Sequence, residues 1–180
     1  MDENLIEKTL KSETVYEGKF LTVKKDTALL SNGREATREW VTHPGASAVL
    51  PLTDDNKIIF ERQYRYPIGK VTLEIPAGKM DKGEDPLLCA KRELSEETGY
   101  TSSDMAKLTT IATTVGFSNE YIHLYLAKNL TQGKQHTDED EFINLVEIPF
   151  IQALEMIKDG TISDAKTICA ILYAKNFINL

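Results

Sequence analysis

Three glutamates close together in one helix-like segment are the residues of this chain best suited to chemistry. The stretch Lys91–Tyr100 reads KRELSEETGY and contains Glu93, Glu96 and Glu97. Residues three and four apart project from the same side of an α-helix, so the three carboxylates share one face about 100° wide. Like charges at that spacing destabilise a helix by about 0.2–0.5 kcal/mol per pair. Two explanations stay open at this point: a solvated acidic face, or an oxygen-rich site for a hard divalent cation.

The composition of the chain narrows the classes of function. Its 180 residues suffice for one domain, or for a compact domain with a small appendage, and can bury a substantial core. The hydrophobic and charged fractions, 41% and 27%, are ordinary for a soluble globular protein. The net charge of −7 argues against duplex nucleic acid as a partner, because phosphate binding relies on clustered Lys and Arg. An anionic substrate would therefore need local neutralisation.

The first residues and the cysteines bear on location. The opening MDENLIEKTL is acidic and lacks an apolar core, so it is not a signal peptide. No apolar run approaches the length that spans a membrane. Cys89 and Cys169 lie in apolar, helix-like surroundings, and we expect buried reduced thiols rather than a disulfide or a metal site. We therefore expect a cytoplasmic protein that does not bind membranes.

The helix that carries the glutamates has clear start and stop signals. Asp85 can cap it, Pro86 suits its first position, and Gly99 suits its end. One side is expected to face a core, because apolar residues recur there at three- and four-residue spacing. These residues are Leu87, Ala90 and Leu94. The acidic face adjoins that buried side rather than opposing it.

The rest of the chain alternates strand-like and helix-like segments. Residues 18–30 and 34–43 flank Ser31-Asn32-Gly33, which predicts a β-hairpin, and residues 46–52 and 57–65 flank TDDN, which predicts a second hairpin by the same reasoning. Three further strands and two further helices follow the acidic helix, the last helix with Asp164 as a plausible cap. Their segments are 108–114, 121–127, 142–148, 150–160 and 164–178. The pattern predicts an α/β sandwich, with residues up to about His43 as a separate small sheet.

The surroundings of the three glutamates carry a family resemblance. From Gly78 the chain reads GKMDKGEDPLLCAKRELSEETGY: a glycine, five residues, Glu84, seven residues, and then the run from Arg92 to Gly99 and Tyr100. This is similar to the Nudix box, a loop–helix–loop pattern that binds divalent metal for pyrophosphate hydrolysis. Every glycine, glutamate and arginine of the pattern is present at its required spacing. Tyr100 departs from it, since an aliphatic residue is more usual there.

The resemblance implies a metal site. Glu93 and Glu97 would be the principal ligands, with Glu96 and the backbone carbonyl of Ala77 completing the site. Mg²⁺ prefers oxygen ligands and keeps several waters, which suits a helix face of this kind, and Mn²⁺ is an alternative. The cation would offset the repulsion between the glutamates and would let an acidic chain hold a diphosphate.

Two other charged residues of the box, Arg92 and Glu84, lie beside the proposed ligands. We expect Arg92 to act with the catalytic residues by orienting a ligand glutamate through a charge-assisted hydrogen bond, rather than by touching substrate. Glu84 lies just before the helix, where the helix dipole favours a carboxylate whatever its function. A structural role and a functional role are therefore both open for Glu84.

The resemblance extends to most of the chain and points to one branch of the family. The segments HPGASAVLPL, IIFERQYRYPIG, LEIPAGKMDKGE, GFSNE, TDEDEF and DAKT together resemble the ADP-ribose pyrophosphatase branch in its short bacterial form. That implies hydrolysis of ADP-ribose to AMP and ribose 5-phosphate. It also implies an α/β fold, a Nudix α/β/α sandwich with a mixed sheet (residues 44–180), preceded by a small antiparallel β dimerisation region (residues 1–43). In the implied homodimer, the N-terminal strands cross to the partner.

One departure keeps the substrate open. The branch typically carries a proline about sixteen residues after the box glycine, where this chain has Val115. Another nucleoside diphosphate sugar or an oxidised nucleotide is therefore an alternative substrate. A protein of another class, a non-catalytic sensor of nucleotide sugars, would be expected to lose box glutamates, whereas this chain retains them all.

The remaining candidate residues come from the resemblance and from side-chain chemistry. The resemblance places a general base in residues 137–141, with Glu139 as first choice and Glu141 as second; the alternative is a solvated charged loop. Arg65 suits a diphosphate, Arg38 could reach the partner's pocket, and Glu120 could bind ribose hydroxyls; the alternative for each is a surface salt bridge. Aromatic residues that could contact adenine are more often core or interface residues. They are Tyr16, Phe20 and Trp40. The three histidines show no metal-ligand spacing, and we assign them no role.

Overall fold

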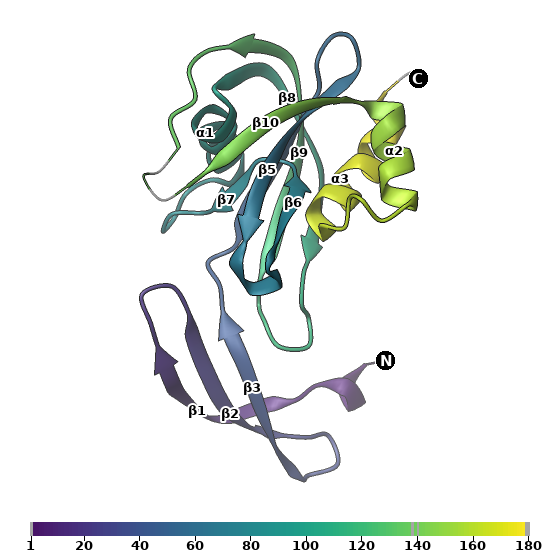
Figure 1. Cartoon of the computed structure of the whole chain (residues 1–180). Coiled ribbons are helices and arrows are strands. Elements are labelled where there is room, and N and C mark those ends of the chain that lie inside the picture. Colours follow the sequence, from purple (N-terminus) through teal and green to yellow (C-terminus); the bar gives the residue numbers. More distant parts are fainter. Residues whose placement is uncertain (1, 138, 140, 179–180) are drawn as a thin grey trace. The chain divides into compact units, whose positions relative to one another are not determined.

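The computed structural model of the chain describes residues 2–137, 139 and 141–178 and separates into two compact units. Unit 1 comprises the residues up to Gly45 together with Ala112–Glu120, and unit 2 comprises Ala46–Ile111 and the residues from Tyr121 onwards (Figure 1). The division expected from the sequence, into residues 1–43 and 44–180, did not assign residues 112–120 to the N-terminal unit. The role of the N-terminal region in dimerisation stays a prediction.

Unit 1 is built on an antiparallel three-stranded sheet in the order β1-β2-β3. Its strands are β1 (Lys8–Glu17), β2 (Thr22–Leu29) and β3 (Glu35–Thr42), preceded by a short 3₁₀ helix, η1 (Glu3–Leu5). The predicted hairpin at Ser31-Asn32-Gly33 is confirmed, with Gly33 at a φ of 80° that suits glycine. β1 was not predicted, because all of its residues are exposed and it lacks the apolar alternation of a half-buried strand.

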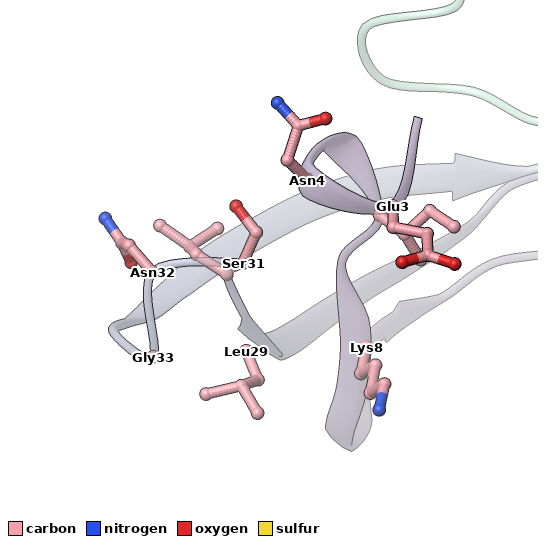
Figure 2. A pocket seen from close by; sticks show the side chains of 9 residues that line it. Glu3, Asn4, Lys8, Leu29, Ser31, Asn32 and Gly33 are labelled. Atoms are coloured by element: carbon pink, nitrogen blue, oxygen red, sulfur yellow. The ribbon is translucent and has the colours of Figure 1, made fainter. Parts of the chain in front are cut away.

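A hollow of about 800 Å³ lies within unit 1, between η1, the beginning of β1 and the turn that joins β2 to β3. Figure 2 shows Asn4, Ser31 and Asn32 around it. None of the residues that line it belongs to the predicted catalytic, metal-binding or substrate-binding sets. The chemistry predicted from the sequence therefore lies elsewhere.

The described residues of unit 2 form two sheets and three α-helices. A four-stranded sheet runs in the order β7-β4-β9-β8, with β4 antiparallel to β7 and parallel to β9. These strands are β4 (Ala46–Pro51), β7 (Ala77–Lys79), β8 (Tyr100–Ala112) and β9 (Tyr121–Gln132). An antiparallel sheet in the order β10-β5-β6 is formed by β5 (Lys57–Arg65), β6 (Lys70–Glu74) and β10 (Ile143–Pro149). The helices are α1 (Pro86–Thr98), α2 (Phe150–Lys158) and α3 (Ala165–Ala174), with short 3₁₀ helices η2 (Tyr66–Ile68) and η3 (Lys175–Phe177).

The layers of unit 2 follow from the burial of β4, whose six residues are all buried. Ala48 and Leu50 belong to a core shared with β5, α2 and α3, whereas Val49 packs with Ala90 and Leu94 of α1. Because successive side chains of a strand point to opposite faces, one strand can serve both cores. Helix α1 therefore covers one face of the mixed sheet, and the second sheet with α2 and α3 covers the other (Figure 1). The predicted α/β/α sandwich is confirmed.

The predicted hairpin between residues 46–52 and 57–65 is wrong. The chain does turn there, with Asn56 at a φ of 59° and an isolated antiparallel bridge between Leu52 and Ile58. Beyond that bridge the two strands enter different sheets, as β4 and β5. A strand that is buried on both faces needs a layer on each side of its sheet; β4 lies between β7 and β9 within its sheet, with α1 on one face and the second sheet on the other. The turn signal was local and correct, whereas the pairing was decided by contacts distant in sequence.

Helix α1 begins and ends where the sequence predicted. The Asp85 side chain accepts hydrogen bonds from the backbone N–H groups of Leu87 and Leu88 at 2.9 and 3.2 Å. Gly99 follows the helix with a φ of 76°, and its N–H donates to the Ser95 carbonyl at 2.9 Å. These bonds satisfy backbone groups that a helix end leaves without partners.

Two further expectations concern the membrane and the cysteines. No helix in the described part of the chain is long and apolar enough to cross a membrane. Both cysteines are free thiols, as predicted. Cys89 is buried, whereas Cys169 is only partly buried.

Candidate active site

The loop before α1 holds the first of the three box glutamates in place. A Cβ atom on Gly78 would overlap the Glu93 carboxyl group and would lie 2.5 Å from its Oε2 atom. Only a glycine therefore lets Glu93 lie against β7 in this way. The spacing of fifteen residues between the two becomes a direct contact because α1 packs on β4 and β7.

Arg92 connects the box residues to one another. Its guanidinium donates to both carboxylate oxygens of Glu84, at 3.0 and 3.1 Å, and to the Lys79 carbonyl at 3.1 Å. It also donates to Glu93 Oε1 at 2.7 Å and to Glu96 Oε2 at 3.0 Å. The hydrogen bonds from Arg92 lower the pKa of Glu84 to about 2, so Glu84 ties the loop to the helix as a carboxylate. The bond to Glu93 is of the kind expected of an orienting arginine.

Glu97 lies deeper than the other two box glutamates. Its side chain is buried, and the N–H of Ala77 donates to its Oε2 atom at 2.8 Å. The amide of Ala77 thus contacts the site directly, while a role for its carbonyl stays a prediction. Burial, together with the charge of Glu93, raises the pKa of Glu97 to about 8. Burial likewise raises the pKa of Glu93 to about 7 against the opposing effect of Arg92.

The segment that precedes the acidic loop, residues 133–136, is docked on the end of α1. The N–H of Gly133 donates to the Gly99 carbonyl at 2.7 Å, and the N–H of His136 donates to the Glu96 carbonyl at 2.9 Å. The Gln135 side-chain amide donates to the Glu97 carbonyl at 2.6 Å. These bonds pair helix-end carbonyls that would otherwise need water, and they bring residues 133–136 onto the site helix. The sequence did not predict this docking, because it depends on backbone groups.

The two candidate bases differ in their surroundings. Glu139 is exposed in a turn. Glu141 is partly buried, and its charge contributes to the raised pKa of both Glu93 and Glu97. Asp138 and Asp140 of the same loop lie outside the described residues. The charge of Glu141 therefore acts on both box carboxylates.

Arg65 is engaged within unit 2. Its guanidinium makes two hydrogen bonds to Glu74, each of 2.8 Å, and about two fifths of its side chain is exposed. Glu74 is buried and is also bound by Thr72 and by the buried Lys166. An arginine held in this way keeps exposed N–H groups, so the pair is compatible with both alternatives left open by the sequence, a salt bridge and a phosphate contact.

Arg38 and Glu120 belong to unit 1. Arg38 is exposed and donates to Glu7, with a bond of 2.9 Å from Nε. Glu120 accepts a hydrogen bond of 2.5 Å from Thr113, and its Oε1 lies 3.4 Å from Nδ1 of His43. The sequence assigned His43 no role, yet it lies beside a predicted substrate residue. Val115, which replaces the usual proline, is 82% exposed.

Sequence reasoning missed Glu61 of β5, which has 2% of its surface exposed. Its carboxyl group lies within hydrogen-bond reach of that of Glu97, and burial raises its pKa well above the ordinary value. The available signal was a carboxylate that directly follows the apolar run Ile58–Phe60 in a predicted strand. A charge at a buried strand position needs a partner or a function.

The donor set suits a divalent cation, although its arrangement is not that of a complete metal site. Among the described residues, no group of three or more His, Cys, Asp or Glu side chains is already arranged around one point. The guanidinium of Arg92 lies between Glu93 and Glu96 and supplies the positive charge there. The buried carboxylates of Glu61, Glu93 and Glu97 have raised pKa values, which shows that their negative charges are not fully compensated. Oxygen ligands of this kind are those that Mg²⁺ and Mn²⁺ prefer.

Comparison with known proteins agrees with the resemblance found in the sequence. Residues 41–171 match the family model of the NUDIX domain, and residues 7–41 match that of the nucleoside diphosphate sugar hydrolase N-terminal domain. The chain is 43% identical over 173 residues to an ADP-ribose pyrophosphatase of Bacillus subtilis, covering 95% of this chain and 94% of the relative. It is 47% identical over 169 residues to a methanol dehydrogenase activator of Bacillus methanolicus, covering 93% and 91%. A crystal structure of an ADP compounds hydrolase shares the fold, with a TM-score of 0.84, 23% identity and coverage of 95% and 93%.

Proposed function

The chain belongs to the Nudix family, and from this premise we propose that it hydrolyses the diphosphate bond of ADP-ribose to AMP and ribose 5-phosphate. Nudix hydrolases generally need a divalent cation, and we propose Mg²⁺ here, with Mn²⁺ as a substitute. The choice of substrate is supported by the 43% identity to an ADP-ribose pyrophosphatase over nearly the whole chain.

One observation carries the catalytic part of the proposal. Glu93 and Glu97 are buried side by side in the C-terminal half of α1, and their pKa values are raised to about 7 and 8. Ionisation of both carboxyl groups in the folded protein is therefore unfavourable. A sequence selected only for stability would avoid such a pair. A cation would remove this cost and would at the same time attract the negatively charged diphosphate.

The residues of the site have separate proposed roles. Glu93 and Glu97 would hold the cation with Glu96 and the Ala77 carbonyl, and Arg92 would keep Glu93 and Glu96 oriented. The cation would supply stabilisation of negative charge on the diphosphate oxygens and activation of water. Gly78 allows the approach of Glu93, and Glu84 secures Arg92 by two hydrogen bonds. Each of these protein contacts exists before substrate arrives, so little reorganisation is required.

We propose Glu141 as the general base, which reverses the order expected from the sequence. Its charge acts on Glu93 and Glu97, whereas Glu139 is exposed in the preceding turn. A carboxylate that acts as a base must reach the attacking water within hydrogen-bond distance, directly or through one further water. Glu139 remains the second candidate.

Arg65, Arg38 and Glu120 remain proposed substrate residues. Arg65 would contact the diphosphate with the N–H groups that Glu74 leaves available, and Glu120 would bind ribose hydroxyls. Exposed Val115 in place of the usual proline favours a second candidate function, the hydrolysis of another nucleoside diphosphate sugar. A non-catalytic sensor is less well supported, because all the box glutamates are retained.

The proposal is tested by hydrolysis of a panel of diphosphate compounds. Purified protein with Mg²⁺ should release AMP from ADP-ribose with a higher kcat/KM than from other nucleoside diphosphate sugars or oxidised nucleotides. One run in ¹⁸O-labelled water would identify the phosphorus that is attacked. Absence of AMP with both Mg²⁺ and Mn²⁺ would refute the enzyme assignment, and a preferred substrate other than ADP-ribose would leave the Nudix assignment and change the substrate.

We also propose a homodimer with exchanged N-terminal strands. The support is that β1 and its neighbourhood expose large apolar side chains that a second copy could cover. They are Leu10, Val15, Tyr16 and Phe20. Light scattering coupled to size-exclusion chromatography should give twice the chain mass of 20.2 kDa. The cytoplasmic location stays a prediction from the sequence.

A further inference from the structure

Two buried glutamates lie opposite each other on neighbouring strands of unit 2. Glu61 of β5 pairs in register with Glu74 of β6, and the two residues are 2% and 3% exposed. Residues directly opposite on antiparallel strands project to the same side of the sheet, and like charges there repel each other. Each carboxylate therefore needs its own compensation.

Glu74 is fully compensated. Arg65 makes two hydrogen bonds to it at 2.8 Å, and Lys166 and Thr72 also donate to its oxygens. Burial raises its pKa, but the bonds from Arg65 and the charge of Lys166 outweigh burial and lower the pKa to about 2. Glu74 is thus an ionised carboxylate with a built set of donors.

Glu61 has no such set. Its Oε1 atom is buried and accepts no hydrogen bond from any residue that the structure describes. The nearest carboxyl group is that of Glu97, which is itself an acceptor when ionised and already receives the N–H of Ala77. Lys166 acts on Glu61 through its charge, yet its ammonium group is bound to Glu74 and lies 3.1 Å from Asp164.

The contrast between Glu74 and Glu61 shows that Glu61 Oε1 lacks a donor or a cation among the described residues. Two neighbouring carboxylates in an interior are stable only with a proton or a cation between them, because an unpaired buried charge is strongly destabilising. Among the described residues, Glu74 has three donor residues and Glu61 Oε1 has none, although both glutamates lie on the same strand pair. The carboxyl group within hydrogen-bond reach of Glu61 is that of Glu97, a box glutamate predicted to bind metal.

We propose that Glu61 is a further residue of the divalent-cation site, where its unpaired oxygen and the Glu97 carboxylate bind the cation together. The inference rests on the proposed function, since it uses the cation that the box glutamates would hold. It extends that site from α1 to β5, on a residue outside the Nudix box. The ligand class is a hard divalent cation, because both groups offer only carboxylate oxygens.

The test measures binding of Mn²⁺ alone, without substrate or turnover. Glu61→Gln keeps the size of the side chain and removes its charge, and it should weaken Mn²⁺ binding at least tenfold by calorimetry or by electron paramagnetic resonance. Glu74→Gln removes a charge from the facing position, which already has its own donors, and should change the Mn²⁺ dissociation constant less than twofold. Glu97→Gln is the reference for loss of the cation site.

The outcomes separate the two proposals. If Glu97→Gln loses Mn²⁺ and Glu61→Gln binds it as the unaltered protein does, Glu61 is not part of the site and the proposed function stands. If the unaltered protein binds no Mn²⁺, the proposed function fails as well. A measurement on the unaltered protein covers the case in which Glu61→Gln does not fold: Mg²⁺ should shift the ¹³C signals of the Glu61 and Glu97 carboxyl carbons, and an unmoved Glu61 signal would overturn the inference.

Discussion

Replacement of Gly78 by alanine should separate the position of a ligand from the stability of the fold. The added Cβ would overlap Glu93 Oε1 and the carboxyl carbon and would lie 2.5 Å from Oε2, whereas ordinary contact begins near 3.4 Å, so the carboxyl group must retreat by more than about 1 Å. Metal–ligand distances tolerate only about ±0.2 Å. A misplacement of 1 Å in an active site costs about 10²-fold in rate, which corresponds to about 2.7 kcal/mol.

The assay is kcat/KM for ADP-ribose at saturating Mg²⁺, together with urea unfolding. We expect Gly78→Ala to lower kcat/KM by about 10²-fold and to change the free energy of unfolding by less than about 1 kcal/mol, because a mobile carboxyl group gives way rather than the backbone.

A double-mutant cycle provides the control for Gly78→Ala. In a Glu93→Gln background the ligand charge is already lost, so adding Gly78→Ala should lower kcat/KM by less than a further threefold. A full additional 10²-fold loss in that background would show that Gly78 acts through something other than Glu93. Wild-type activity in the single variant would refute the argument from close approach.

Four further predictions concern the same site. Glu97→Gln should lower kcat by orders of magnitude and leave the fold intact, since it removes a ligand charge and little volume; near-normal turnover at saturating Mg²⁺ would contradict the metal assignment. Glu141→Gln should depress kcat more than Glu139→Gln, and the opposite order would return the role of base to Glu139. Gly99→Ala should lower the free energy of unfolding by more than about 2 kcal/mol, because Gly99 has a φ of 76° and its Cβ would lie 2.6 Å from the backbone nitrogen of Gln135; a loss below about 0.5 kcal/mol in urea unfolding would contradict this. The pKa values of Glu93 and Glu97 are raised on folding to about 7 and 8, so the folded state binds more protons than the unfolded state above about pH 4.5. In the presence of a chelator, the melting temperature should therefore fall as pH rises from 5 to 8, and excess Mg²⁺ should reduce that fall. A melting temperature that does not change with pH in chelator would show that the two carboxylates are not destabilising.

Local signals in the sequence were reliable where the structure depends on neighbouring residues. Asp85, Pro86 and Gly99 mark the two ends of α1, because capping and a left-handed C-terminal residue involve contacts within a few positions. The hairpin at Ser31-Asn32-Gly33 formed for the same reason. The family assignment also came from spacing along one loop and one helix.

Signals that depend on distant pairing were less informative. The turn after β4 was predicted, yet β4 pairs with β7 and β9 rather than with β5, which lies in the second sheet that covers one face of β4. β1 went unpredicted because an exposed strand has no periodicity. The docking of residues 133–136 on α1 uses the backbone groups of Gly133 and His136, which side-chain patterns do not reveal.

The sequence by itself determined the identity of the box, the helix that presents Glu93, Glu96 and Glu97, and the family to which the chain belongs. The position of these three glutamates on one face of the helix follows from the helix period of 3.6 residues per turn. Only the tertiary structure decided that Glu97 meets Glu61, that Glu93 lies on Gly78, and that Glu141 acts on both box glutamates. Burial and electrostatic coupling depend on which surfaces come together in space, and one sequence read in order does not contain those distances.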